Sequence, residues 1–218
     1  HVFGNPGTTE LPVMDALSRS DLEYVLALQE DIAVGAAAGY AQTRRYHSHD
    51  DDSVMPAGVV NLHVTPGLAH GVGNTYGAMM SGAPLVITAG NHELDFRHEE
   101  PILTGDLEAM VDQFCKYSTE VTSVEALPMI LRRAFRTALT PPTGPVFLAL
   151  PVDVMMAETG ADPERLGPIP DAGMGDPVQI DRAADYLVEA DDPVLVLGDE
   201  VARAGAVDEA VQLAEATG

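Results

Sequence analysis

Residues 24–39 read Tyr24-Val-Leu-Ala-Leu-Gln-Glu30-Asp-Ile-Ala-Val-Gly-Ala-Ala-Ala-Gly39, an apolar run that ends in a carboxylate and leads into small residues. The apolar run predicts a strand over Leu22–Leu28, and the small residues predict a closely packed helix over Glu30–Arg44. A near-continuous apolar run is typical of a strand buried on both faces of a parallel sheet. This segment is therefore the first indication of an α/β fold.

The same alternation continues along the chain. Apolar runs predict further strands at Gly58–His63, Pro84–Gly90 and Pro145–Pro151, and the chain opens like the inside of another strand. Helical patterns are predicted at Glu10–Ser18, Gly67–Met80, Leu107–Phe114 and Val124–Leu139. This order of elements predicts an α/β fold with an open, mostly parallel sheet flanked by helices.

The chain is expected to hold one domain and the beginning of another. Residues 1–160 form the first domain, and residues 161–177, rich in Pro, Gly and Asp, are a predicted linker. Residues 178–218 predict the start of a truncated second α/β domain. Its expected elements are a helix at Asp181–Glu189, a buried strand at Pro193–Gly198 and a helix at Val201–Thr217. Because both ends look cut, we expect the chain to be a fragment.

The composition restricts the classes of partner. The chain has 34 acidic and 11 basic residues, a net charge of −23, which repels nucleic acid and anionic membranes. Hydrophobic residues make up 46%, too many for a disordered chain. Such a surface predicts a halophilic protein, because concentrated salt screens the repulsion between carboxylates. Cys115 is the one cysteine and an expected core residue, and no apolar run could span a membrane, which together indicate a cytoplasmic protein.

Two loops are candidates for ion binding. Segment 46–53 is expected to be an exposed loop, and a metal site on it is a less favoured alternative, made from His47, His49 and Asp50. The turn Gly4-Asn-Pro-Gly-Thr-Thr-Glu10 precedes a helix that Thr8 or Thr9 could cap, and its backbone N–H groups could hold an anion. Since it lacks the phosphate-loop lysine and the dinucleotide glycine pattern, an ordinary capped turn is the simpler interpretation.

Titratable side chains follow two of the predicted strands. Glu30 and His63 stand where parallel strands end, the edge at which α/β sheets bind their ligands. Together they predict an acid–base site. The alternatives are a Glu favoured by the helix dipole in a first helical turn, and a hydrogen-bonded structural His. His70 is expected one helical turn beyond the start of the next helix.

Several collinear motifs resemble the thiamine-diphosphate-dependent 2-oxo-acid decarboxylase and acetolactate synthase superfamily, and within it the benzoylformate decarboxylases. The motifs are Val2-Phe-Gly-Asn-Pro-Gly-Thr-Thr-Glu-Leu-Pro12, Leu26-Ala-Leu-Gln-Glu30, Gly39-Tyr-Ala-Gln42, Asn61-Leu-His63, Pro84-Leu-Val-Ile-Thr-Ala-Gly90 and Gly144-Pro-Val-Phe-Leu-Ala-Leu-Pro-Val-Asp153. The resemblance runs along nearly the whole chain apart from an acidic insertion near residue 50. It implies a domain that binds the cofactor's pyrimidine, followed by the start of the family's middle domain.

The resemblance also implies roles for individual residues. Glu30 matches the glutamate that hydrogen-bonds N1′ of the aminopyrimidine and activates the cofactor. His63 matches a histidine that assists proton transfer, and Thr8 stands in place of a serine that contacts the substrate. His70 falls where many members have Asn. Further cofactor contacts are implied for Asn5, Pro6, Gly7, Pro66, Gly67 and His70.

By the same resemblance, part of the site lies outside these residues. The family binds Mg²⁺ and diphosphate through a carboxyl-terminal domain with a Gly-Asp-Gly…Asn-Asn pattern, which this sequence lacks, so no metal ligand is assigned here. The implied active sites lie between subunits of a homodimer or homotetramer, and this segment alone is expected to be inactive. The implied reaction is non-oxidative decarboxylation of a small 2-oxo acid. The alternatives are carboligation of the acetolactate synthase type and a non-catalytic module that kept the fold.

Overall fold

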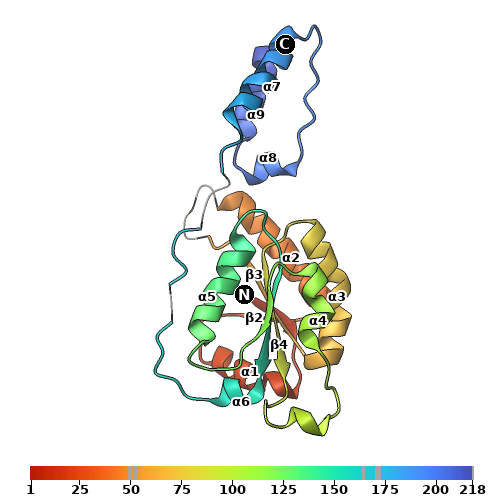
Figure 1. The fold of residues 1–218 in the computed structure, drawn as a ribbon, viewed down its shortest axis with the longest axis vertical. Helices are drawn as coiled ribbons and strands as arrows, with labels where there is room; N and C mark the ends of the chain where they lie inside the picture. Colours follow the sequence, from red (N-terminus) through yellow and green to blue (C-terminus); the bar gives the residue numbers. More distant parts are fainter. Residues whose placement is uncertain (49–50, 52–53, 164, 170–172, 218) are drawn as a thin grey trace.

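The computed structural model describes residues 1–48, 51, 54–163, 165–169 and 173–217. Its centre is a six-stranded sheet in the order β2-β1-β3-β4-β6-β5, in which every pairing is parallel (Figure 1). The strands are β1 (Val2–Asn5), β2 (Tyr24–Leu26), β3 (Gly58–Leu62), β4 (Leu85–Asn91), β5 (Ser118–Glu120) and β6 (Val146–Pro151). The predicted fold class is confirmed.

Helices cover both faces of the sheet. On one face lie α2 (Glu30–His47), α3 (Val64–Met80) and α4 (Leu107–Val111). On the other lie α1 (Leu11–Ser18), α5 (Leu127–Leu139) and α6 (Val152–Met156). Three short 3₁₀ helices complete the domain: η1 (Thr8–Glu10), η2 (Arg97–Glu99) and η3 (Asp112–Phe114).

Each face of the sheet has its own hydrophobic core. Small residues of α2, such as Ala33, Ala37 and Ala41, have no exposed surface and pack with Leu62 against the first face. Gly71 lets α3 pack closely against β3, because a Cβ at position 71 would lie 2.9 Å from Leu62 Cδ1. Cys115 packs against the same core, as expected. With both faces covered, the central strands are mostly apolar, which is why their sequence signal is strong.

Several predicted elements differ from the structure. Strand β2 is an edge strand and only half-buried, so the expectation that it is covered on both faces is wrong. The segment predicted as the helix 107–114 divides into α4 and η3, and the polar strand β5 was missed. Pro193–Gly198 forms no strand, and the Val194 and Val196 side chains are 80% and 92% exposed. Within the described residues this segment has no neighbouring strand to pair with.

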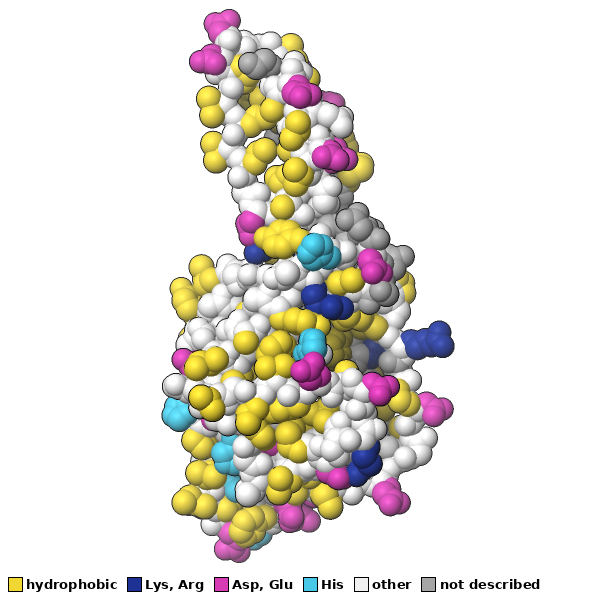
Figure 2. Space-filling view, turned by 180° about the vertical axis from the view of Figure 1, so that it is seen from behind, with side chains coloured by type: hydrophobic (Ala, Val, Ile, Leu, Met, Phe, Trp, Pro, Cys, Tyr) yellow, Lys and Arg dark blue, Asp and Glu magenta, His cyan; other side chains and the backbone are white. Residues whose placement is uncertain are grey.

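Three helices extend from one end of the domain: α7 (Pro177–Glu189), α8 (Asp199–Arg203) and α9 (Val207–Thr217). They lie at the top in Figure 1, where Arg203 donates to the backbone oxygen of Ser81 at 2.8 Å and Glu200 lies 3.9 Å from Arg45. These contacts are at the carboxyl-terminal ends of α2 and α3. Hydrophobic side chains cover much of this extension (Figure 2).

Across the part of the chain that the structure describes, no helix is both long enough and apolar enough to cross a membrane.

Candidate active site

The candidate site lies where the order of the strands reverses. The chain passes from β1 outward to β2, and then returns to β3 on the other side of β1. The carboxyl ends of β1 and β3 therefore form a topological switch point, the position at which open α/β sheets bind their ligands. Asn5 ends β1, His63 directly follows β3, and Glu30 begins the helix after β2. In Figure 1 this edge is the lower end of the domain, opposite α7–α9.

Glu30 is a buried carboxylate with two side-chain partners. It is the first residue of α2, as the dipole interpretation expects, yet it is only 8% exposed. Asn5 Nδ2 donates to Glu30 Oε1 at 3.2 Å, and His70 Nδ1 lies 3.2 Å from Glu30 Oε2. The structure thus brings together three of the predicted site residues. Both contacts are long, so lone pairs of the carboxylate remain available to a further donor.

Gly67 keeps the space beside this carboxylate open. A Cβ at position 67 would lie 3.2 Å from Glu30 Oε1 and 3.0 Å from His63 Cβ. Pro66 precedes it in the first turn of α3, where proline is tolerated because the helix does not need its N–H. A flat donor ring could therefore approach Glu30 over a glycine, and this arrangement fits an aminopyrimidine.

The sequence did not reveal Glu10, which lies at the centre of the site and has no exposed surface. Its Oε2 accepts from the Gly7 N–H at 2.8 Å and lies 2.9 Å from His63 Nδ1. Its Oε1 accepts from the backbone N–H groups of Gly90 at 2.9 Å and Val64 at 3.3 Å. One carboxylate therefore joins the ends of β1, β3 and β4. The sequence signal for it is its position three residues after Gly7, the spacing of a capping box.

The two threonines of the turn differ in their burial. Thr8 is exposed and Thr9 is buried. The Thr9 hydroxyl donates to Glu10 Oε1 at 2.6 Å and lies 3.3 Å from His63 Nδ1. Neither threonine caps the following helix through its side chain, so that expectation is wrong; Glu10 binds the turn's N–H instead.

The backbone is distorted beside His63. Val64 has φ +29°, although a β-branched residue disfavours positive φ, and its N–H is held by Glu10. Gly7 lies against the imidazole so closely that a Cβ there would be 2.1 Å from Nδ1. Both features fix the histidine against the turn after β1, and Pro6 precedes that contact in the chain.

Tyr24 lies near this cluster on β2. Burial raises the pKa of its phenol, and the negative charge of Glu10 raises it further. Its hydroxyl is buried without a hydrogen-bond partner among the described residues. Gly4 accommodates it, because a Cβ there would lie 2.2 Å from the Tyr24 hydroxyl oxygen. The Tyr24 phenol therefore borders the site as an uncharged group.

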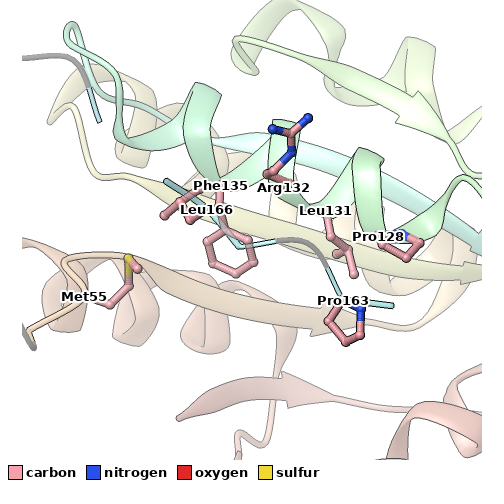
Figure 3. Close-up of a pocket in the computed structure, with 7 residues that line it drawn as sticks. All are labelled: Met55, Pro128, Leu131, Arg132, Phe135, Pro163 and Leu166. Carbon is pink, nitrogen blue, oxygen red and sulfur yellow. The ribbon is translucent and has the colours of Figure 1, made fainter. Parts of the chain in front are cut away.

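Two other sites are less suited to catalysis. In the less favoured metal-site alternative, His49 and Asp50 lie outside the described residues. Among the described residues, no cluster of three His, Cys, Asp or Glu could hold a metal. A separate hollow of about 340 Å³ lies against α5 (Figure 3). Its lining is apolar except for one arginine, and consists of Met55, Pro128, Leu131, Arg132, Phe135, Pro163 and Leu166. It offers no acid–base pair.

Comparisons with known proteins identify the family of the chain. Residues 1–115 match the family model described as thiamine pyrophosphate enzyme, N-terminal TPP binding domain. The chain is 35% identical to benzoylformate decarboxylase of Pseudomonas aeruginosa over 217 residues, which are 98% of this chain and 39% of that protein. It is 30% identical to a probable acetolactate synthase large subunit of Methanocaldococcus jannaschii over 223 residues, which are 98% of this chain and 36% of that protein.

A solved structure is also similar. The thiamine diphosphate-dependent 4-hydroxybenzoylformate decarboxylase of Rhodococcus jostii aligns with a TM-score of 0.84 and 34% identity, covering 99% of this chain and 40% of that one. The resemblance found in the sequence is confirmed. The chain spans less than half the length of these relatives.

Proposed function

This chain belongs to the thiamine pyrophosphate enzymes, whose N-terminal cofactor-binding domain its residues 1–115 match, and we propose that it serves the non-oxidative decarboxylation of a small 2-oxo acid. The observation that carries the proposal is the buried Glu30 carboxylate, held by Asn5 and His70 beside the space that Gly67 leaves open. A module without chemistry has no evident need for this carboxylate at the switch point of its sheet.

Thiamine diphosphate, when bound, would supply an electron sink for the decarboxylation. The chain's own part is to hold the pyrimidine and to manage protons. Glu30 would accept a hydrogen bond from the ring at Oε1 or Oε2, and Asn5 and His70 keep those oxygens in place. Because Glu30 is only 8% exposed, a hydrogen bond from the ring to its carboxylate would be stronger than the same bond in solvent.

His63 is the proposed proton carrier for the substrate. It borders the same space beside Gly67 as Glu30, because a Cβ at position 67 would meet both residues. We assign substrate contact to Thr8, which is exposed on the turn before them, and cofactor contact to Pro6, Gly7 and Pro66. The histidine favours decarboxylation over carboligation, since by resemblance the synthases usually carry no His at this point.

The rest of the proposed enzyme lies outside the described residues. Mg²⁺ and diphosphate would be bound by a carboxyl-terminal domain of a partner subunit, in a cytoplasmic homodimer or homotetramer. Residues 178–218 would begin a middle domain after the 161–177 linker. The exposed side chains of Val194 and Val196 support this, because a sheet with helices on both faces would bury them.

Replacing Glu30 by Gln in the full-length protein tests the proposal. With thiamine diphosphate and Mg²⁺ present, Glu30→Gln should abolish CO₂ release from benzoylformate and slow proton–deuterium exchange at C2 of the bound cofactor. Asp31→Asn is the matched control, because it removes the same charge from the same helical turn and should keep activity. Unchanged turnover in Glu30→Gln would refute the mechanism. With pyruvate as the substrate, acetolactate as the product in place of acetaldehyde would select the alternative, which the similarity to an acetolactate synthase supports.

A further inference from the structure

We infer that Glu10 is a positioning residue that fixes the orientation and the tautomer of His63, so that Nε2 is presented to the substrate as a proton acceptor. The inference rests on the proposed function, in which His63 carries protons, and it extends that function to a residue that does not touch the reacting atoms.

The hydrogen-bond pattern determines the tautomer. His63 Nδ1 lies 2.9 Å from Glu10 Oε2 and 3.3 Å from the Thr9 hydroxyl. The hydroxyl has one proton, which it donates to Glu10 Oε1 at 2.6 Å, so toward Nδ1 it can only accept. A carboxylate is also an acceptor. Both partners of Nδ1 therefore require a proton on it, and in the neutral ring Nε2 keeps its lone pair.

The carboxylate itself cannot turn. Three backbone N–H groups bind its two oxygens: Gly7 follows β1, Val64 begins the helix after β3, and Gly90 lies near the end of β4. Buried donors of this kind are costly to leave unpaired, so the carboxylate stays in one rotamer. Val64, which directly follows the histidine, has a positive φ and donates its N–H to Glu10. A rigid acceptor thus faces one edge of the imidazole.

The other edge of the ring is available. The His63 side chain is 22% exposed, while its Nδ1 edge is covered by Glu10 and Gly7. Nε2 has no hydrogen-bond partner among the described residues. This division of one buried, bonded nitrogen and one open nitrogen is the arrangement that an orienting carboxylate gives to a catalytic histidine.

The first test needs neither cofactor nor turnover. Diethylpyrocarbonate acylates a ring nitrogen that has a lone pair, and mass spectrometry after digestion gives its rate at each histidine of the full-length apoprotein. In Glu10→Gln, the side-chain amide can donate to Nδ1 and select the opposite tautomer, so modification of His63 should slow several-fold. The exposed His98 is the internal reference and should react at the same rate in both proteins. An unchanged His63 rate in a folded variant would overturn the inference.

Should Glu10→Gln fail to fold, neutron diffraction of the wild-type protein gives the answer directly. A deuteron on Nδ1 of His63 and none on Nε2 is expected in the neutral ring. A deuteron on Nε2 with Nδ1 bare would overturn the inference.

A double-mutant cycle then links the geometry to the reaction. Glu10→Gln should lower kcat by roughly a hundredfold with KM little changed, and should cost nothing further in a His63→Leu background. An equal loss in both backgrounds would mean a structural role and would overturn the inference. If Glu30→Gln keeps full activity, the proposed function fails instead. The diethylpyrocarbonate and neutron experiments still decide the orientation of His63 by Glu10, because they do not depend on catalysis.

Discussion

Oε2 of Glu10 lies 2.9 Å from Nδ1 of His63, so a carboxylate with no exposed surface connects the turn after β1 to the residue that follows β3. The same carboxylate reaches β4 through the Gly90 N–H. A Cβ at Gly90 would lie 2.2 Å from Glu10 Oε1, so glycine is required for this contact. The fold of the strand ends and the geometry of the candidate site therefore depend on one side chain.

Glu10→Ala should destabilise the domain strongly. The substitution leaves the N–H groups of Gly7, Val64 and Gly90 without an acceptor, and we expect the free energy of unfolding to fall by about 3–5 kcal/mol. Urea unfolding followed by circular dichroism measures this. Glu23→Ala is the control, since Glu23 is exposed and its pair with His1 should be worth under about 1 kcal/mol. Equal losses in the two variants would contradict the role given to Glu10.

Gly67→Ala should weaken cofactor binding without unfolding the protein. The new Cβ would press on Glu30 Oε1 and His63 Cβ, and crowding of this kind costs about 1–3 kcal/mol, which corresponds to roughly a tenfold or greater rise in the Kd of thiamine diphosphate. Gly73→Ala on the same helix has no atom within 4 Å of its Cβ and should stabilise the fold by about 0.5–1 kcal/mol. Cofactor titration and thermal unfolding distinguish the two. A Kd that is unchanged in Gly67→Ala would mean that this space is not the pyrimidine site.

His70 should matter less than Glu30. Its side chain is 61% exposed, so solvent screens its contact with Glu30 Oε2, and His70→Leu should weaken cofactor binding by less than about tenfold. His70→Asn keeps an N–H donor and should lie closer to the wild type. The Kd of thiamine diphosphate for both variants checks this. A loss in His70→Leu as large as that in Glu30→Gln would show that His70 is required.

The sequence predicted the parts of the site that depend on one strand each. Glu30 and His63 can be predicted because each follows an apolar run, and a parallel sheet brings the carboxyl ends of its strands to one edge. Glu10 could not be predicted in this way, because its partners come from three separate segments, at the ends of β1, β3 and β4, that meet only in the folded sheet. Strand β5 is polar and pairs only because β6 is beside it, so no local pattern indicates it. Pro193–Gly198 shows the opposite case. Its sequence pattern predicts a strand, but the described residues contain no adjacent strand with which it could pair.

Stability should fall at alkaline pH in part through Cys115. Burial, with a smaller contribution from Asp112, raises the pKa of this thiol from 9.0 to about 12. As pH rises above 9, the unfolded chain loses the thiol proton while the folded chain keeps it, so the free energy of unfolding decreases up to about pH 12. Cys115→Ala should make this decline shallower by up to about 1.4 kcal/mol per pH unit. Denaturant unfolding from pH 8 to 11 tests it. Tyr24, whose phenol pKa is also raised, should leave a residual slope, and identical slopes in both proteins would contradict the assignment.

Salt should stabilise this protein. Its net charge of −23 implies repulsion between surface carboxylates, and the screening length shortens from about 10 Å at 0.1 M salt to about 3 Å at 1 M. We therefore propose a halophilic protein whose Tm rises steadily from 0.1 to 2 M KCl, and which loses structure in dilute buffer. KCl is the appropriate salt, because sulfate would strengthen apolar burial whatever the charge. Scanning calorimetry across the KCl series measures the effect. A Tm that is independent of KCl, with full stability in dilute buffer, would mean that the acidic surface is tolerated without salt and that the halophilic interpretation is wrong.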